Sequence, residues 1–213
     1  MSVRVLIVDD QQLVRAGVRM LCETAPDLDV VGEATGGADA VRLAARTSPD
    51  VVLMDLRMPG TDGIAATRQI LATRPVTRIL ALTTFDDDEH LYPALHAGMC
   101  GFLVKDAHPT QLLDAIRRAA DGDPVFSPDV LRRVVGAALD HRAPPAVPDG
   151  PEPTPREREV LRLLADGLSN AEIGAHLNMG ITTVKTHVAN LMTKTGADNR
   201  VRLAVHGLRT LRH

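Results

Sequence analysis

The stretch that decides the fold is Val51-Val52-Leu53-Met54-Asp55-Leu56-Arg57-Met58-Pro59-Gly60. Its four leading apolar residues predict a strand that is buried on both faces, as in a parallel sheet. The run ends at Asp55, and Pro59-Gly60 predicts a loop soon afterwards. Because open α/β sheets bind ligands at the carboxyl ends of their strands, Asp55 is a candidate site residue. Taken alone, it is equally well explained as an acid that merely ends a strand.

The first 122 residues alternate between strand-like and helix-like segments. Strands are expected at Val3–Val8, Asp29–Glu33, Asp50–Met54, Thr77–Leu82 and Gly101–Val104. Helices are expected after them, at Gln12–Glu23, Ala38–Arg46, Asp62–Ala72, Asp87–His96 and Pro109–Ala120. This alternation with short loops predicts an α/β fold, a flavodoxin-like (βα)5 domain with a parallel five-stranded sheet. The absence of a G-x-G-x-x-G or Walker A motif counts against nucleotide binding.

A proline-rich connection follows, with six prolines between positions 140 and 155. We therefore expect domains at 1–122 and 150–213 joined by a linker at 123–149, in which a helix could form near 127–139. Beyond the linker, a capping box at Thr154 and Glu157 opens the first of four short helices. Two short helices with a tight turn and then a longer one, Ile181–Thr195, form a helix-turn-helix pattern. The expected C-terminal domain is therefore an all-α four-helix domain.

The two expected domains differ in charge, although the whole chain carries a net charge of only −3. Residues 1–125 hold 12 Lys and Arg against 18 Asp and Glu, whereas residues 151–213 hold 9 against 6. The mildly basic second domain is weak support for nucleic-acid binding. No secretory segment follows Met1 and no apolar run approaches 18 residues, so we expect a cytoplasmic protein with no membrane association.

Five polar residues are expected where strands of the first domain end. Asp9 and Asp10 follow the first strand, Asp55 the third, Thr83 the fourth and Lys105 the fifth. Three carboxylates at one sheet edge would repel one another, and Mg²⁺ would relieve that repulsion. A carboxylate beside Mg²⁺ can attack a phosphoryl group, while a lysine and a threonine can contact its oxygens. Singly, each residue also fits an ordinary role as a helix cap, a turn residue or a surface ion-pair partner.

The motifs Asp9-Asp10, Met54–Gly60, Leu82-Thr83-Thr84 and Gly101–Asp106 resemble the receiver domain of bacterial two-component response regulators. The resemblance covers roughly residues 1–122. It implies that Asp55 is the phosphoacceptor and that Mg²⁺ is bound by Asp9, Asp10, Asp55 and the main-chain carbonyl of Arg57. It also implies that Thr83 and Phe102 form a switch pair and that Lys105 contacts the phosphoryl group.

The long helix Ile181–Thr195 has an apolar face and an opposite face that is small, polar and lightly basic. Such a face suits the major groove, or is simply a solvated surface in a small bundle. The segments Thr154–Leu161, Gly167–Ile173 and Thr183–Val188 are similar to the LuxR-type DNA-binding domain. That resemblance implies that Ile181–Thr195 is the recognition helix. The expected DNA contacts are Thr182, Thr183, Lys185, Thr186, Ala189, Asn190 and Lys194.

Together, the two resemblances imply a two-component response regulator of the NarL/FixJ family, a DNA-binding transcription regulator rather than an enzyme. Its implied partners are a sensor histidine kinase that phosphorylates Asp55, double-stranded DNA, and a second copy in a phosphorylated homodimer. The receiver would catalyse its own phosphorylation and dephosphorylation.

Two alternatives stay open on the sequence. A phosphotransferase or phosphatase working through an aspartyl phosphate is disfavoured because Arg57 stands where haloacid-type phosphatases carry a second acid. A regulator that no longer needs phosphate is disfavoured by the intact set Asp10, Asp55, Thr83 and Lys105.

Overall fold

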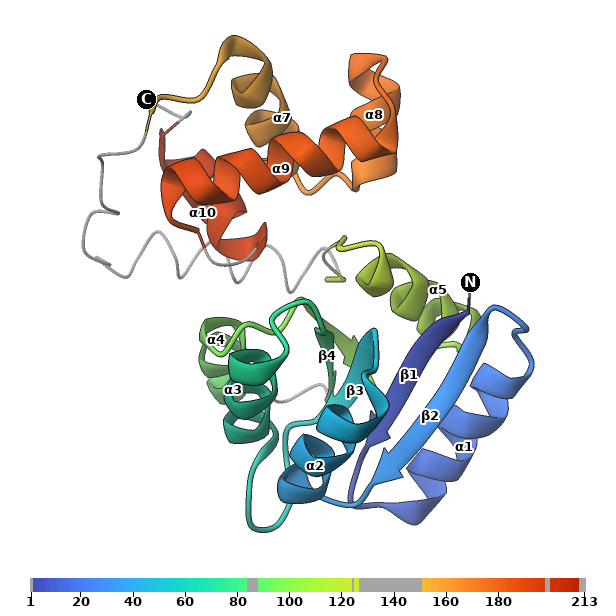
Figure 1. The fold of residues 1–213 in the computed structure, drawn as a ribbon. Coiled ribbons are helices and arrows are strands. Elements are labelled where there is room, and N and C mark those ends of the chain that lie inside the picture. The colour runs from blue at the N-terminus through green and yellow to red at the C-terminus, as the bar shows by residue number, and fades with distance from the viewer. Residues whose placement is uncertain (1, 84–87, 124, 127–150, 198–199, 211–213) are drawn as a thin grey trace. The chain divides into compact units, whose positions relative to one another are not determined.

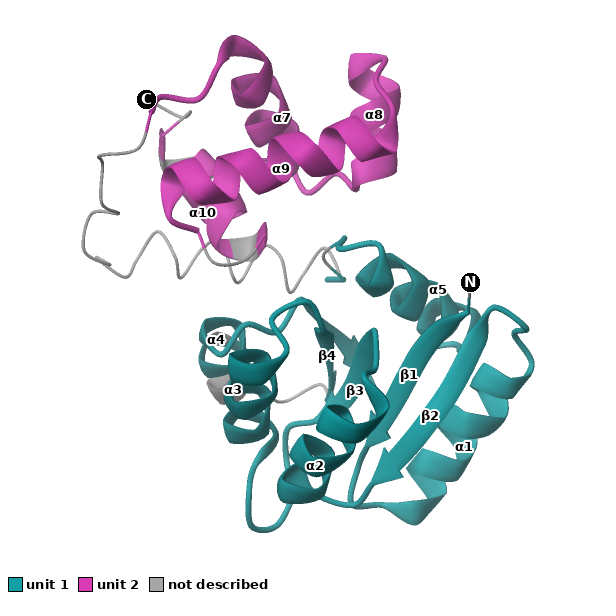
Figure 2. Ribbon diagram, in the orientation of Figure 1, with its two compact units in different colours: residues 1–127 teal, residues 128–213 magenta. Residues whose placement is uncertain are grey.

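The computed structural model describes residues 2–83, 88–123, 125–126, 151–197 and 200–210. The chain divides into two compact units, residues 1–127 and 128–213, and each is described by itself (Figure 2). The helix expected near 127–139 lies outside the described residues. The domain bounds at 122 and 150 stay a prediction.

The first unit is a parallel five-stranded sheet with strand order β2-β1-β3-β4-β5 (Figure 1). Its strands are β1 (Val3–Val8), β2 (Leu28–Ala34), β3 (Val51–Asp55), β4 (Arg78–Thr83) and β5 (Gly101–Val104). Its helices are α1 (Gln12–Glu23), α2 (Gly37–Thr47), α3 (Gly63–Thr73), α4 (Asp88–His96) and α5 (Pro109–Ala120). This order and alternation confirm the predicted flavodoxin-like (βα)5 fold.

The sheet is buried on both faces, which explains why its strands are continuous apolar runs. Residues Val5 to Val8 of β1 and Val51 to Met54 of β3 are fully inaccessible to solvent. Alternate side chains of these strands pack with Cys22 of α1 and with Leu112 and Ile116 of α5 in one core cluster. The intervening side chains point to the opposite face of the sheet because strand side chains alternate.

The strand and helix bounds agree with the predicted ones to within one residue. The central strand illustrates the difference, since β3 extends through Asp55 instead of ending at Met54. Asp55 still pairs with Leu82 of β4, so its backbone remains part of the ladder. The candidate residue is therefore held by the sheet itself and not by a loop.

After α5 the chain returns to the outer edge of β5. Val125 forms a parallel bridge with Gly101. Its carbonyl accepts a 2.7 Å hydrogen bond from the Phe102 amide, and its own amide donates to the Cys100 carbonyl at 3.3 Å. We call the pair Val125 and Phe126 the β5 clip. The clip satisfies backbone groups that an uncovered edge strand would expose.

The second unit has four described helices, α7 (Pro155–Ala165), α8 (Asn170–Leu177), α9 (Ile181–Thr195) and α10 (Arg200–Thr210). The predicted capping box at Thr154 and Glu157 is present, and a second one joins Ser169 to Glu172. Asn178 takes a left-handed conformation with φ of 50° and ends α8 before the turn into α9. The all-α helix-turn-helix unit is thus confirmed, with a core of Val160, Leu161, Leu164, Ile173, Val184, Val188, Leu191 and Leu203.

None of the helices in the described ranges combines the length and the apolar character that a membrane crossing requires.

Candidate functional site

The sheet edge gathers three carboxylates, as the strand ends predicted. One carboxylate oxygen each from Asp9, Asp10 and Asp55 lies within 4.8 Å of the others. Asp9 is completely buried and Asp55 is 3% exposed, whereas Asp10 is exposed. The Gln11 amide donates to Asp9 Oδ1 at 2.8 Å and the Arg57 amide donates to Asp55 Oδ1 at 3.1 Å. Backbone donors therefore orient the two buried acids, and the third faces solvent.

Lys105 joins the cluster from the end of β5. Its Nζ lies 2.7 Å from Asp55 Oδ2 and 2.8 Å from Asp9 Oδ2. The Lys105 amide also donates to the Thr83 carbonyl at 2.8 Å, which fixes the base of the side chain beside β4. The ammonium is thus placed between two acids that come from different strands.

Burial and charge act in opposite directions on the pKa values of these groups. Burial raises the pKa of Asp55, and the hydrogen bonds from Lys105 and from the Arg57 amide only partly reverse that effect. Burial lowers the pKa of Lys105, but its bonds to Asp55 and Asp9 outweigh burial and leave that pKa raised. Lys105 is therefore a firmly held cation, while Asp55 is a carboxylate that gains from further positive charge nearby.

Two neighbouring segments fix the backbone around this cluster. A Cβ added to Gly63 would lie 2.2 Å from the Asp55 carbonyl oxygen, so only glycine lets α3 begin so close to β3. On the other side, Arg15 of α1 donates from Nη1 to the Asp9 carbonyl at 2.8 Å. Arg15 Nε also lies 3.5 Å from Glu33 Oε2 of β2. The peptide that joins Asp9 to Asp10 is thereby tied to two elements.

Thr83 and Phe102 lie on adjacent strands at the same edge. Each is 7% exposed. The ladder pairs Ala81 with Phe102 and Thr83 with Val104, so the side chains of Thr83 and Phe102 project from the same face of the sheet. Phe102 is already buried with Asp55 unmodified, and its ring centroid lies 6.1 Å from that of Phe126. A movement of the Phe102 ring would therefore start from a buried position.

The donor set fits a hard divalent cation. Mg²⁺ prefers carboxylate and carbonyl oxygens and keeps several waters, which suits two buried acids beside one exposed acid. Asp9 Oδ2 and Asp55 Oδ2 already face the Lys105 ammonium at 2.8 and 2.7 Å, so a cation here would share these carboxylates with that lysine. Chemically, the cluster offers a carboxylate nucleophile, a fixed cation and a hydroxyl at one solvent-accessible edge.

The predicted DNA-contact face lies on α9. Six of the seven predicted residues are exposed, namely Thr182, Thr183, Lys185, Thr186, Ala189 and Asn190. The buried face of the same helix carries Val184, Val188 and Leu191. The outer face is therefore held rigidly by a packed inner one.

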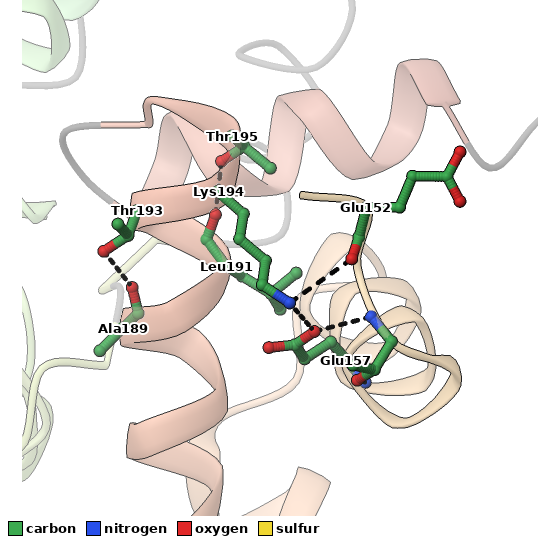
Figure 3. A network of polar contacts seen from close by, with 8 residues as sticks. Glu152, Glu157, Ala189, Leu191, Thr193, Lys194 and Thr195 are labelled. Carbon is green, nitrogen blue, oxygen red and sulfur yellow. Dashed lines mark hydrogen bonds and ion pairs between the residues drawn. The ribbon is translucent and has the colours of Figure 1, made fainter. Parts of the chain in front are cut away.

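Lys194, the seventh residue of that set, lies in a different environment (Figure 3). Its Nζ is 2.7 Å from Glu157 Oε2 and 3.4 Å from the Glu152 carbonyl. The Lys194 and Glu157 side chains are 19% and 4% exposed, and the Thr154 amide donates to the same Glu157 oxygen at 2.7 Å. Lys194 thus fastens the C-terminal end of α9 to the capping box of α7.

Glu157 is held as an anion by these contacts. Burial raises its pKa, but the Lys194 ammonium and the Thr154 amide outweigh burial and lower the pKa from 4.5 to about 2. The sequence identified Glu157 only as half of a capping box. It gave no sign that Arg15, Glu157 and Phe126 contact predicted site residues, because those contacts join distant segments.

Comparison with known proteins agrees with this geometry. Residues 5–117 match the family described as "Response regulator receiver domain", and residues 154–206 match "Bacterial regulatory proteins, luxR family". The transcriptional regulatory protein LiaR of Bacillus subtilis is 42% identical over 207 residues, which span 97% of both chains.

Two solved structures extend the likeness to the whole chain. The response regulator ChrA of a heme-sensing two-component system is 36% identical with a TM-score of 0.54, covering 99% of this chain and 98% of ChrA. A structure of two RcsB dimers bound to two parallel DNAs is 27% identical with a TM-score of 0.59, covering 99% of this chain and all of RcsB. From its two matched domains and these full-length relatives, the chain belongs to the LuxR-type transcriptional response regulators of two-component systems.

Proposed function

We propose that Asp55 is the residue through which this regulator receives its signal, as the acceptor of a phosphoryl group from a sensor histidine kinase. The observation that carries the proposal is the ion pair of 2.7 Å between Lys105 Nζ and Asp55 Oδ2 inside a cluster of three acids. A structural ion pair does not need two further carboxylates beside it. A phosphoryl-transfer site does, because it must also accommodate a cation.

The transfer would be a direct displacement. An Asp55 carboxylate oxygen attacks the phosphorus of a phosphohistidine, the new P–O bond forms, and the P–N bond breaks as the imidazole leaves. The Lys105 ammonium, which contacts both Asp9 and Asp55, can exchange one of these carboxylates for a phosphoryl oxygen as negative charge develops on that oxygen. Asp9, Asp10, Asp55 and the Arg57 carbonyl would hold Mg²⁺, which when bound supplies charge neutralisation for the incoming phosphoryl oxygens. The same groups would serve self-phosphorylation by small donors and hydrolysis of the product.

The switch would start at Thr83. Its hydroxyl, at the end of β4, would turn to a phosphoryl oxygen, and the buried Phe102 ring would shift into the space released. Reversing a two-state population from 1:99 to 99:1 requires about 5.5 kcal/mol of differential stabilisation. In the phosphorylated state Lys105 would exchange a carboxylate partner for a phosphoryl oxygen, and the Thr83 hydroxyl would add a bond to another phosphoryl oxygen.

For DNA binding we propose the exposed side of α9, with Thr182, Thr183, Thr186, Ala189 and Asn190 at base edges and Lys185 at a phosphate or guanine. Lys194 belongs to this surface less directly, because Glu157 neutralises its charge. Its contribution would be to hold the helix at the correct angle. The RcsB dimers on DNA support a homodimer here. In this proposal phosphorylation favours that dimer, and its two copies read half-sites about one helical turn apart.

The test is phosphorylation with acetyl phosphate and Mg²⁺ followed by intact-mass measurement. A single phosphoryl adduct on the wild-type chain and none on Asp55→Asn is expected. Rapid donor consumption without an adduct would indicate a phosphatase, and an adduct that survives Asp55→Asn would exclude Asp55 as the acceptor.

A further inference from the structure

The β5 clip, Val125 with Phe126, occupies the position at which the first unit leads into the rest of the chain. Its backbone continues the sheet beyond β5, through the bridge from Val125 to Gly101. Its side chains alternate as those of a strand do: Val125 packs in the core cluster with Leu112 and Ile116 of α5, whereas Phe126 contacts Phe102. The clip is therefore a built extension of the sheet and not a loose tail.

Phe102 makes two of the contacts that hold the clip. Its amide donates to the Val125 carbonyl at 2.7 Å, and its ring lies 6.1 Å from the Phe126 ring at an interplanar angle of 31°. That separation is within the range of favourable aromatic pairs. A shift of the Phe102 ring must therefore alter the contact with the Phe126 ring, beside a backbone hydrogen bond that ties Val125 to the same residue.

Gly101 shows how closely the clip is fitted. A Cβ at this position would lie 2.4 Å from the Val125 carbonyl oxygen and 2.8 Å from the Val125 nitrogen. No side chain fits there while the clip is in place. Gly101→Ala would therefore displace Val125 through the backbone, without touching the Phe126 ring.

We propose that Val125 and Phe126 are positioning residues that transmit the state of Phe102 to the segment leading to the DNA-binding unit. The inference rests on the proposed switch, in which Phe102 shifts when Asp55 is phosphorylated. In the unphosphorylated chain the Phe102 ring holds Phe126 and closes the clip. Phosphorylation moves the Phe102 ring away from Phe126, so the clip loosens from β5.

The direct test is hydrogen exchange, read by mass spectrometry, on the peptide that contains residues 123–126 in the full chain. An aromatic pair of this kind changes an opening equilibrium about two- to tenfold. Exchange in wild type should rise by that factor when acetyl phosphate and Mg²⁺ produce the adduct. Phe126→Ala should exchange at the faster rate in both states, whereas Phe126→Tyr, which keeps the ring, should behave as wild type.

The functional readout is the ratio of DNA affinities with and without the phosphoryl group. The probe is a duplex selected from random-sequence DNA by the phosphorylated wild-type chain. Phe126→Ala and Gly101→Ala should both form the Asp55 adduct as wild type does, yet their affinity ratio should fall towards one. One variant removes a ring and the other displaces the backbone. A variant that still forms the Asp55 adduct has a folded first unit, so a lost affinity ratio in both cannot be assigned to unfolding of that unit.

Failure of the clip and failure of the switch give different results. Unchanged exchange at 123–126 in a wild-type chain that carries the adduct would overturn the proposed role of the clip. A Phe126→Ala chain that keeps the wild-type affinity ratio would overturn it as well. A wild-type chain without an adduct overturns the proposed function itself, and this inference with it.

Discussion

Replacing Lys194 with methionine should destabilise the C-terminal unit measurably, because Glu157 would stay buried without its counter-charge. The Lys194 and Glu157 side chains are 19% and 4% exposed and lie 2.7 Å apart. The pKa of Glu157 is lowered from 4.5 to about 2. At 1.36 kcal/mol per pKa unit, that difference corresponds to roughly 3 kcal/mol at neutral pH. Since the Thr154 amide still donates to Glu157, we expect a loss of about 2 kcal/mol for Lys194→Met.

The effect has a defined pH window. Because the folded-state pKa of Glu157 lies below its unfolded value, its contribution is fully present above pH 4.5 and is lost as the pH falls towards 2. The stability difference between wild type and Lys194→Met should therefore be largest near neutrality. It should shrink through that window as Glu157 becomes protonated in both proteins.

Native-state hydrogen exchange in α7 and α9 of the full chain measures this stability locally. A loss of about 2 kcal/mol predicts exchange roughly 30-fold faster at neutral pH. Lys185→Met is the matched control, because it removes an exposed lysine from the same helix and should change exchange less than threefold or so. A Lys194→Met effect no larger than that of the control, or one that does not depend on pH below 4.5, would refute the reasoning.

Four other outcomes can be checked. Arg15→Met should weaken Mg²⁺ binding, measured by calorimetry, because the Asp9 carbonyl loses its 2.8 Å donor; tighter binding would mean that only the removed positive charge matters. Lys185→Ala should lower DNA affinity and reduce the salt slope by about one, and an unchanged slope would contradict a phosphate contact. Arg117→Met should return the pKa of Asp27 in NMR titrations from about 2 towards 3.8, and a pKa that stays near 2 would mean that Arg117 is not the cause. Both cysteine thiols, whose pKa values burial raises to about 11, should resist iodoacetamide at pH 8 in the folded chain, and rapid alkylation would contradict that burial.

Much of the fold was predictable because its signals are local. The apolar run before Asp55, the capping box at Thr154 and the glycine after α9 each depend on neighbouring residues. The gathering of Asp9, Asp55 and Lys105 was also predictable, because a parallel sheet brings the ends of its strands to one edge. One general rule of topology was enough to join residues far apart in the chain.

What the sequence did not reveal depends on side-chain packing between distant segments. Lys194 looks like other basic residues on a polar helix face, and only the position of Glu157, 37 residues earlier, shows that its charge is paired. Phe126 lies in a stretch that composition assigns to a linker, and its contact with Phe102 follows from the return of the chain to β5. Periodicity describes which face of an element is apolar, but it does not say which residue of another element meets it.

The scarcity of aromatic residues in this chain has a practical benefit for spectroscopy. The protein contains three phenylalanines, and two of them form the contact between β5 and the clip. Biosynthetic labelling with fluorophenylalanine would therefore give a fluorine spectrum of three resonances. Single Phe-to-Tyr substitutions would assign them without an isotope-edited backbone spectrum. Two of the three fluorine resonances would come from Phe102 and Phe126, the two rings of the same contact. Their shifts would therefore report directly on the proposed point of signal transfer.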